Sequence, residues 1–470
     1  MTRFNSTSAT TKTVNLAGGQ AYKQTSRQEF LSILFTSFLK DQFYQTADDT
    51  ISRIKSLIVN EDKKFVAKAA IYARTKLGMR SVSHLVASEV AKAVKGATWS
   101  RSFFQKIVNR PDDMTEILAC YMSSYGKPIP NSLKKGFAKV LEGLDDYKLA
   151  KYRMGGKDVS MVDVINMVHP RATKSLTKLI EGQLKNLDTW EAKLSGAGQS
   201  EGEDTDSAKA DAWASLLKEG KLGYMALLKN LRNILEQAPE CVPMACEQLV
   251  NKEAIQKSLV FPFRFATAFK QLEQVNADGT RKVLNALSHA TDLSMSNVPS
   301  FPGKTLIVLD VSGSMSSVIE KAALFASVLY KACDSDLMLF ESDAHYETFM
   351  PTDTTLFIAE RLEQMAHGGG TNFHSIFETA NRAYDRIVIL SDMQGWIGNN
   401  CPTKTLQAYK QRTGANPHVF SFDLAGYGSL QFPENNVYCL AGFSDKILGM
   451  MKFLEEDKKA IEHEIESIVL

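Results

Sequence analysis

Oxygen-bearing side chains with the chemistry of a metal site follow two apolar segments in the C-terminal part of the chain. Asp310, Ser312 and Ser314 occupy alternate positions directly after the run TLIVL, and Asp392 follows shortly after the run RIVIL. Thr371 comes after three consecutive glycines, in a turn that precedes a predicted helix. A carboxylate and hydroxyls presented from a tight turn suit a hard divalent cation that keeps some of its water ligands. Because the carboxyl ends of parallel strands meet in one crevice, we expect all five side chains to lie together.

This order of residues resembles the metal-ion-dependent adhesion site of von Willebrand factor A domains. The resemblance implies that Asp310, Ser312 and Ser314 bind a divalent metal ion, Mg²⁺ above all, that Thr371 joins the site, and that Asp392 binds through water. On its own, the Asp-x-Ser-x-Ser turn would also fit a simpler interpretation in which Asp310 and Ser312 form the turn and cap a helix. The threonine and the second aspartate, which follow in the family's order, favour the metal site.

The sequence shows no clear nucleophile or base beside this site. A haloacid-dehalogenase phosphatase also places an aspartate after its first strand, but it needs a second carboxylate two residues later, and Ser312 stands there. Asp343 and His345 could form a metal or proton-transfer pair, although a loop beside a strand explains them as well, and His374 is assigned to the helix after Thr371. We therefore predict a docking site without catalytic residues, in a protein that is not an enzyme.

The elements that must position these residues alternate between strand and helix. Continuous apolar runs bounded by turn residues are typical of buried parallel strands, and amphipathic segments lie between them. The predicted strands are KTLIVLDVS, DLMLFES, YDRIVILSDM, HVFSFDLAG and VYCLAGFS, and the predicted helices are SSVIEKAALFASVLYKAC and TNFHSIFETANRAY. The alternation predicts an open, Rossmann-like α/β sheet over residues 299–470, which is the von Willebrand factor A domain that the resemblance implies.

The preceding residues carry a helical pattern almost without interruption. Apolar residues recur at three-to-four spacing in segments such as SRQEFLSILFTSFLKDQF and TADDTISRIKSLIV, the second behind a Thr46 cap. Short helices joined by few turn residues favour a HEAT-like α-solenoid over residues 21–298, after a flexible N-terminus at residues 1–20. Apolar positions vanish over residues 195–211, so we expect an exposed acidic loop or a disordered insertion in the helical array there.

Positive charge concentrates in the first part of the chain. Residues 1–190 carry 30 Lys and Arg against 17 Asp and Glu, and the remainder carries 25 against 36, so the formal charge of +2 conceals a basic half of +13 and an acidic half of −11. Between residues 127 and 174, cations crowd around short predicted helices, with Tyr147 and Tyr152 among them. Phosphate contacts and base stacking are a natural use of such a surface, and a solvated lysine-rich face is the alternative.

Several motifs, taken in order, resemble the TROVE family. SLKKGFAKVLEGLDDYKLAKY and VDVINMVHP are followed by LGYMALLKNLRNI, LVFPFRFATAF and FPGKTLIVLDVSGSM, and the similarity extends over about residues 20–470. The resemblance implies a ring of HEAT-like helices closed by the von Willebrand factor A domain. It also implies that small noncoding RNAs of the Y RNA type bind a basic outer surface, that single-stranded 3′ ends of misfolded RNA enter the central hole, and that a 3′ exonuclease is a further partner.

The family's RNA-binding residues match this chain at specific positions. Lys151 falls on a family lysine implicated in RNA binding, and His169 falls on the histidine that ends the next helix, with Arg153 and Lys157 in the turn between them. The spacing of that turn varies within the family, so the match of its cations can shift by one or two residues. From the residues alone, His169 would be an ordinary helix C-terminus. The remaining RNA-binding candidates, taken on charge and neighbourhood, are Lys134, Lys135, Lys139, Lys148 and Lys174.

Composition narrows the class of protein further. With 470 residues, 44% hydrophobic and 23% charged, the chain is expected to be globular, with two or three domains. The absence of an apolar run of about 18 residues and of a leader-like start predicts a cytoplasmic protein without membrane contact. The six cysteines form no Cys-x-x-Cys pair, so we expect them to be reduced. A ring closed by its own domain predicts a monomer.

A second function stays open at this point. The metal site could recruit a protein partner such as an ATPase, with the basic helices serving only as a solvated surface. This adaptor would lose its function when the metal is removed, whereas an RNA-binding scaffold would lose it when the cations are reversed.

Overall fold

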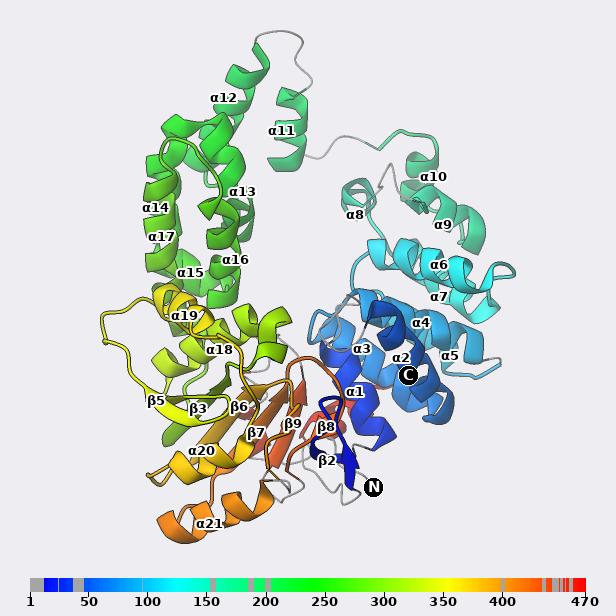
Figure 1. The fold of residues 1–470 in the computed structure, drawn as a ribbon. Helices are drawn as coiled ribbons and strands as arrows, with labels where there is room; N and C mark the ends of the chain where they lie inside the picture. Colours follow the sequence, from blue (N-terminus) through cyan, green and yellow to red (C-terminus); the bar gives the residue numbers. More distant parts are fainter. Residues whose placement is uncertain are drawn as a thin grey trace.

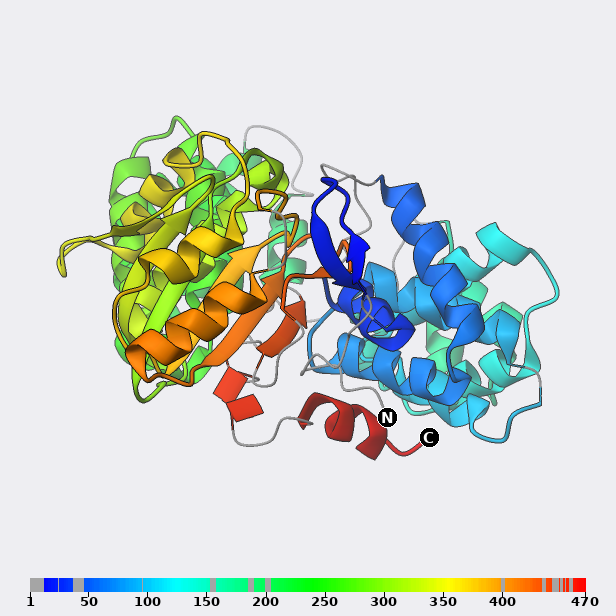
Figure 2. The same ribbon diagram turned by 60° about the horizontal axis from the view of Figure 1, so that its bottom comes forward.

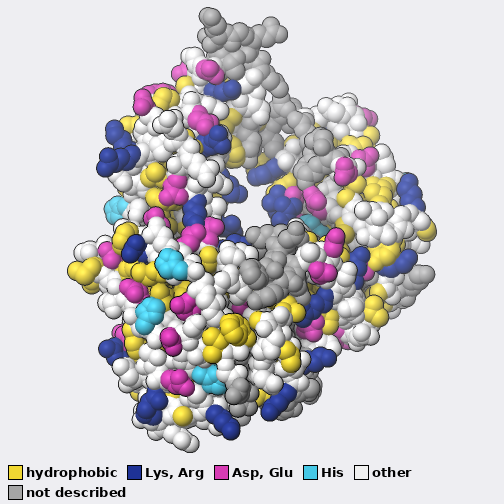
Figure 3. All heavy atoms as spheres, in the orientation of Figure 1, with side chains coloured by type: hydrophobic (Ala, Val, Ile, Leu, Met, Phe, Trp, Pro, Cys, Tyr) yellow, Lys and Arg dark blue, Asp and Glu magenta, His cyan; other side chains and the backbone are white. Residues whose placement is uncertain are grey.

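Two arms of helices and one sheet domain surround a central opening (Figures 1 and 3). The computed structural model describes residues 12–23, 25–36, 46–94, 96–152, 158–184, 190–198, 204–398, 402–432, 437–441, 448, 451–452, 454–455 and 460–470. In Figure 1 the first arm is blue to cyan, the second arm is green, and the sheet domain lies below both. The predicted combination of a helical ring with an α/β domain is therefore confirmed.

The first arm is a stack of short helices that pack in pairs, such as α3 on α4 and α5 on α7. Thr46 and Asp49 form a capping box at the start of α2, as the sequence predicts. A Cβ atom on Gly136 would lie 2.5 Å from the Cβ of Phe104, so only glycine lets α7 approach α5 this closely. The helices are α1 (Ser26–Thr36), α2 (Ala47–Asn60), α3 (Lys63–Thr75), α4 (Ser81–Ala93), α5 (Ser100–Lys106), α6 (Asp112–Tyr125), α7 (Asn131–Glu142), α8 (Asp146–Lys151), α9 (Met161–Val168) and α10 (Lys174–Ile180).

The second arm has its own hydrophobic core, which includes Trp213, Leu231 and Phe265. Its helices are α11 (Trp190–Ala197), α12 (Asp204–Lys218), α13 (Tyr224–Gln237), α14 (Val242–Leu249), α15 (Lys252–Ser258), α16 (Pro262–Glu273) and α17 (Thr280–Leu293). None of the helices in the described part of the chain is long and apolar enough to span a membrane.

The expected loop at residues 195–211 is mostly wrong. Residues 195–197 end α11 and residues 204–211 begin α12, while residues 199–203 lie outside the described part. Acidic residues such as Asp204 and Asp206 favour the first turn of a helix, and the alanines that follow are strong helix formers. The shortage of apolar residues in this segment therefore reflects the start of a helix whose described side chains, at residues 206–211, are exposed or half-buried.

The sheet domain contains a six-stranded sheet in the order β5-β4-β3-β6-β7-β9. All neighbouring strands are parallel except β5, an antiparallel edge strand that the sequence analysis did not predict. The strands are β3 (Lys304–Asp310), β4 (Asp334–Phe340), β5 (Ala344–Glu347), β6 (Arg386–Ser391), β7 (His418–Asp423) and β9 (Val437–Ala441), and the helices around them are α18 (Ile319–Ala332), α19 (Thr355–Gln364), α20 (Phe373–Thr379) and α21 (Thr403–Thr413).

Alternate residues of β3 face two different cores, as expected for a strand buried on both faces. Ile307 belongs to the same core as Phe325 of α18. Val308 belongs to the core that contains Phe377 of α20 and Tyr409 of α21. The domain is therefore a three-layer α/β/α structure, with the carboxyl ends of β3 and β6 adjacent to each other.

Each end of the described chain contacts the part of the ring that is distant from it in sequence (Figure 2). The hairpin of β1 (Lys12–Val14) and β2 (Gln20–Lys23) pairs with β8 (Ser429–Leu430) of the sheet domain. At the other end, α23 (Ala460–Ser467) lies against α3 of the first arm, and Lys106 Nζ donates a 2.6 Å hydrogen bond to the carbonyl of Val469. The expectation of a flexible N-terminus is wrong for residues 12–20, because strand pairing holds them, and residues 1–11 lie outside the described part.

Candidate metal centre and nucleic-acid interface

Two neighbouring strands hold the first carboxylate of the candidate metal centre. The register pairs Leu309 of β3 with Leu390 of β6, which brings Asp310 beside Ser391. Ser391 Oγ donates a 2.6 Å hydrogen bond to Asp310 Oδ2, and the backbone N–H of Ser312 donates a 3.0 Å bond to Asp310 Oδ1. The carboxylate is thereby oriented by both strand ends.

The serine hydroxyls lie on the turn that follows β3. Ser312 Oγ is 3.4 Å from Ser314 Oγ, and both side chains are buried together with Asp310. A Cβ atom on Gly313 would lie 3.7 Å from the Cα of Gly368, so the glycine loop before Thr371 packs directly on this turn. The structure therefore brings Asp310, Ser312 and Ser314 together and places the glycine loop against them.

The loop after β6 reaches the same place. The backbone N–H of Trp396 donates a 3.1 Å hydrogen bond to the carbonyl of Thr371, which joins this loop to the glycine loop. Thr371 is buried, and Asp392, at the carboxyl end of β6, is fully buried. All five predicted residues consequently belong to three loops that contact one another at the carboxyl end of the sheet.

Burial in this crevice disfavours the charged forms of both carboxylates. Burial raises the pKa of Asp310, and the neighbouring charge of Asp392 raises it further. Burial likewise raises the pKa of Asp392. Asp392 Oδ1 accepts a 3.1 Å hydrogen bond from the backbone N–H of Gln394, whereas Asp392 Oδ2 is buried and has no hydrogen-bond partner among the described residues. Burying such an unpaired oxygen is costly, and a cation would offset the cost.

The donor set fits a hard cation. Two carboxylates and the hydroxyls of Ser312, Ser314 and Thr371 supply oxygen ligands only, which Mg²⁺ prefers together with several waters. In the described part of the chain, no cluster of three His, Cys, Asp or Glu side chains could hold a metal. A cation in this crevice therefore depends on hydroxyl oxygens as well as carboxylates.

The other candidates for chemistry lie on different elements. His345 is part of the edge strand β5 and pairs with Leu339, so the expectation of a loop is wrong for this residue. Asp343 lies in the bend before β5. His374 lies in α20, with its Nδ1 3.3 Å from Thr405 Oγ1. Both histidines are placed by secondary structure rather than by a catalytic arrangement.

Gln394 connects the metal centre to the N-terminal hairpin. The backbone N–H of Leu16 donates a 2.8 Å hydrogen bond to Gln394 Oε1, and Gln394 Nε2 donates a 3.1 Å bond to the carbonyl of Asp392. Asn15 Nδ2 donates a further 2.6 Å bond to the carbonyl of Gly395. The sequence analysis missed this link, because nothing local pairs residues that are 378 positions apart.

Helices α7 to α10 gather the predicted RNA-binding cations at the end of the first arm (Figure 1). Lys178 of α10 forms a 2.7 Å salt bridge with Asp146 of α8, which holds these two helices side by side. The backbone N–H of Arg171 donates a 3.1 Å hydrogen bond to Glu142, so the turn after α9 lies against the end of α7. In Figure 1, α8 lies nearer the opening than α7 and α9.

His169 ends a helix, as its sequence position alone suggested. It ends α9 in the left-handed conformation, with φ 52°, and its backbone N–H donates a 3.0 Å bond to the carbonyl of Ile165. Its side chain is nevertheless exposed, at the turn that contacts α7. His169 is therefore a helix cap whose imidazole remains open to a ligand.

Several of the predicted cations are not neutralised by acidic side chains. Lys139 lies 4.0 Å from Glu142, and Lys151 Nζ lies 5.9 Å from the ring centre of Tyr147. Among the described residues, Lys134, Lys135, Lys148, Lys151 and Lys174 form no salt bridge. Arg153 and Lys157 lie outside the described residues. We call the exposed set the basic surface: Lys135, Lys139, Lys148, Lys151, His169 and Lys174.

A buried ion network lies inside the first arm, between helices α3, α4 and α6. Asp113 is fully buried and accepts hydrogen bonds from Arg74 at 2.9 Å and from His84 at 2.9 Å. Burial raises the pKa of Asp113, but these hydrogen bonds outweigh burial and lower it to about 2. The adjacent Arg110 stacks over the ring of Tyr152 at 5.2 Å. The sequence analysis missed this network, and Arg110 at its edge is the residue that contacts Tyr152.

Comparison with known sequences connects these features to a family. The TROVE domain matches residues 13–193 and, in an overlapping match, residues 181–335. Telomerase protein component 1 of Rattus norvegicus is 22% identical over 350 residues, which covers 54% of this chain and 13% of that protein. The RNA-binding protein RO60 of Deinococcus radiodurans is 24% identical over 343 residues, which covers 61% of this chain and 64% of that protein. The chain thus spans less than two thirds of the length of either relative.

One solved structure has the same overall arrangement. The crystal structure of the Deinococcus radiodurans RO (RSR) protein aligns with a TM-score of 0.62 and 19% sequence identity. The alignment covers 92% of this chain and 100% of that chain. The two proteins therefore share the fold of helical arms joined to a single α/β domain.

Proposed function

Because this chain belongs to the TROVE family, we propose that it is an RNA-binding scaffold that acts in RNA stabilisation and quality control. Small structured noncoding RNA of the Y RNA type binds the basic surface, and single-stranded 3′ ends of misfolded RNA enter the central opening. The similarity to a protein named as RNA-binding supports the RNA partner. The scaffold holds RNA without performing catalysis itself, and a 3′ exonuclease is the partner that would act on the bound end.

The single observation that carries this proposal is the set of unneutralised cations within the TROVE-matched residues. Lys148, Lys151 and Lys174 are exposed and form no salt bridge among the described residues. A lysine that forms no internal salt bridge can bind a phosphate without breaking a contact within the protein. Such lysines therefore favour RNA binding more than lysines that are already paired. Tyr147, which is 49% exposed, adds a ring on which a base can stack.

The opening is the second RNA surface in this proposal. Figure 3 shows Lys and Arg side chains at its rim. A basic passage between two arms would admit a single strand but exclude a folded duplex, so selection would depend on RNA shape and on an accessible end.

The crevice at the end of the sheet is proposed to hold Mg²⁺. Asp310, Ser312 and Ser314 would bind the ion, with Thr371 beside them and Asp392 acting through water. When bound, the ion would offer an open coordination position to an acidic side chain or a phosphate. A second candidate function is therefore a protein-docking adaptor, in which a partner protein binds at this open position. The side chains of Trp396 (52% exposed) and Leu16 (49% exposed) lie beside the crevice and favour this second function.

Purification of the chain from its own host in low salt tests the proposal. The wild-type protein should carry a discrete small RNA, and the double variant Lys151→Glu, His169→Ala should lose it. A matched variant, Lys252→Glu, changes an exposed lysine in the first turn of α15 on the other arm and should keep it. If wild type carries no RNA, or all three proteins carry the same random RNA, the adaptor becomes the better account.

A further inference from the structure

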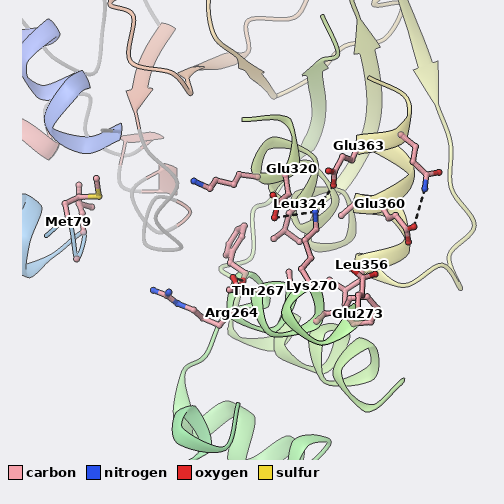
Figure 4. Close-up of a pocket in the computed structure, with 18 residues that line it drawn as sticks. Met79, Arg264, Thr267, Lys270, Glu273, Glu320, Leu324, Leu356, Glu360 and Glu363 are labelled. Carbon is pink, nitrogen blue, oxygen red and sulfur yellow. Dashed lines mark hydrogen bonds and ion pairs between the residues drawn. The ribbon is translucent and has the colours of Figure 1, made fainter. Parts of the chain in front are cut away.

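The first arm and the sheet domain meet beside the metal centre. The N-terminal hairpin, which leads into α1 of the first arm, pairs with β8 of the sheet domain. Arg53 of α2 donates a 2.9 Å hydrogen bond to the carbonyl of Tyr427, in the loop that precedes β8. The second arm is held at a different place, where Lys270 of α16 forms salt bridges with Glu363 at 2.8 Å and with Glu320 at 3.4 Å (Figure 4). The contacts of the first arm with the sheet domain are therefore the ones that adjoin the metal centre.

The loop after β6, residues 392–397, begins with an uncommon backbone conformation. Met393 has φ 60°, in the left-handed region that residues other than glycine rarely adopt. Such a conformation costs about 1–3 kcal/mol and persists only where surrounding contacts hold it. Here the backbone N–H of Met393 donates a 2.9 Å bond to Ser391 Oγ, and Gln431 Nε2 donates a 3.0 Å bond to the carbonyl of Met393. The position of Asp392 therefore depends on contacts that the neighbouring residues make.

Gln394 supplies further contacts of this kind from its side chain, which is fully buried. Its Nε2 donates hydrogen bonds to the carbonyl of Asp392 at 3.1 Å and to Ser429 Oγ at 2.8 Å. Its Oε1 accepts a 2.8 Å bond from the backbone N–H of Leu16. Ser429 belongs to β8 and Leu16 belongs to the turn of the hairpin. One amide group thus joins the metal centre to both of these elements.

The turn of the hairpin fits closely against the loop after β6. Asn15 Oδ1 accepts hydrogen bonds from the backbone N–H groups of Ala17 at 3.1 Å and Gly19 at 2.8 Å, which closes the turn. The same side chain donates through Nδ2 to the carbonyl of Gly395. A Cβ atom on Gly19 would lie 2.0 Å from that carbonyl oxygen. The hairpin and the loop therefore hold each other in position.

This arrangement couples the hairpin to cation binding on physical grounds. A ligand binds more weakly when it must order its own site, because ordering costs conformational entropy. The hairpin orders the loop that carries Asp392, so a cation that uses Asp392 does not have to. By thermodynamic linkage, a bound cation must then stabilise the docked hairpin by the same factor.

We infer that the N-terminal hairpin is a functional part of the metal centre and that Gln394 is the positioning residue through which it acts. The hairpin raises the affinity of the crevice for Mg²⁺, and bound Mg²⁺ holds the hairpin and the first arm more firmly against the sheet domain. This role of the hairpin rests on the Mg²⁺ site of the proposed function. It gives the ion a task within the chain itself, for which no partner protein is needed.

Isothermal titration of the full chain with Mg²⁺ measures the affinity of the crevice. Gly19→Ala, which displaces the hairpin, should weaken binding about tenfold, a factor typical of coupling between two sites. Asn15→Ala, which removes the bond to Gly395, should weaken binding in the same direction and by less. Asn251→Ala is the matched control, because it removes an asparagine that accepts a backbone hydrogen bond from Ala254 on the second arm. It should leave Mg²⁺ binding unchanged.

A double-mutant cycle tests the role of Gln394. Gln394→Met keeps the length of the side chain, removes the amide group and should weaken Mg²⁺ binding about tenfold. In the Gly19→Ala background the same change should add little, since both act through one contact. Fully additive effects would overturn the assignment of Gln394 as the link.

Hydrogen exchange on the wild-type protein tests the reverse direction and needs no variant. Mg²⁺ should slow exchange of the Leu16 backbone amide about tenfold relative to EDTA, the factor by which Gly19→Ala weakens binding. In Asp310→Asn, which lacks a proposed ligand, Mg²⁺ should leave this exchange rate unchanged.

The outcomes separate the hairpin from the metal centre. Equal Mg²⁺ affinity of wild type and Gly19→Ala, or exchange at Leu16 that Mg²⁺ does not slow, overturns the inference and leaves the metal centre standing. Wild type that binds no Mg²⁺ overturns both, while the proposal of RNA binding stands on the basic surface. If Gly19→Ala does not fold, the affinity of Asn15→Ala and the exchange of wild type decide.

Discussion

The hydroxyl of Ser391 donates a 2.6 Å hydrogen bond to the buried carboxylate of Asp310, across two strands whose residues are 81 positions apart in the chain. This bond holds one oxygen of Asp310 while the backbone N–H of Ser312 holds the other. Nothing equivalent reaches Asp392 Oδ2 among the described residues. The crevice is therefore built to orient carboxylates and leaves negative charge that a cation can neutralise.

Removal of one carboxylate should abolish stabilisation by Mg²⁺. Ligand that binds only the folded state stabilises it by about 2.7 kcal/mol at a hundredfold excess over Kd, so Mg²⁺ should raise the Tm of wild type. Asp310→Asn should not respond, whereas Asp343→Asn, an exposed aspartate in the bend before β5, should respond as wild type does. Thermal unfolding with Mg²⁺ and with EDTA measures this. An equal response of Asp310→Asn would refute the assigned ligands.

The buried network around Asp113 should make stability depend on pH in a defined direction. Its pKa is about 2 in the folded protein, below the ordinary aspartate value of 3.8, so the ionised form favours folding. This contribution is complete above about pH 5 and declines as the pH falls from about 4 toward 2. Asp113→Asn should cost about 3–5 kcal/mol at pH 7, because Arg74 and His84 lose a buried partner.

Urea unfolding at pH 7 and pH 3 measures this difference. The difference in the free energy of unfolding between wild type and Asp113→Asn should be smaller at pH 3 than at pH 7. A difference of equal size at both pH values would show that the network is not held by the ionised carboxylate.

The N-terminal hairpin should depend on the absence of a side chain at residue 19. A Cβ atom on Gly19 would lie 2.0 Å from the carbonyl oxygen of Gly395, so Gly19→Ala must displace the hairpin from the loop after Asp392. Hydrogen exchange of the backbone amides of Leu16 and Trp396 should become faster. Gly223→Ala is the control, because no atom lies within 4 Å of its Cβ and φ is −60° there. Unchanged exchange in Gly19→Ala would mean that the hairpin does not brace this loop.

Local patterns in the sequence predicted most of the elements, because each depends on nearby residues. The Thr46 cap and the parallel strand before Asp310 are examples. The edge strand β5 is only four residues long, and strands β2 and β8 pair with each other although they lie near opposite ends of the chain. Such pairings leave no periodic signal, so they could not be predicted.

Within the candidate site, too, local features could be predicted from the sequence and long-range contacts could not. The five oxygen-bearing residues were predicted to lie together because their order is that of a known motif. Gln394 was not predicted, because its contact depends on a hairpin at the other end of the chain. The acidic segment at residues 204–211 was misjudged as a loop because few apolar residues mark a helix with a largely exposed surface. Composition alone does not distinguish a loop from a solvent-exposed helix.

The salt dependence of RNA binding tests the central claim most directly. The probe is a stem-loop RNA with a single-stranded 3′ tail, and its Kd is measured by filter binding at several salt concentrations. The double variant Lys148→Gln, Lys151→Gln should weaken binding and lower the slope of log Kd against log salt by about 1.4–1.8, since each phosphate contact contributes about 0.7–0.9. The control pair Lys252→Gln, Lys257→Gln on α15 should leave the slope unchanged. Equal slopes for wild type and the α8 variant would contradict the assignment of RNA binding to the basic surface.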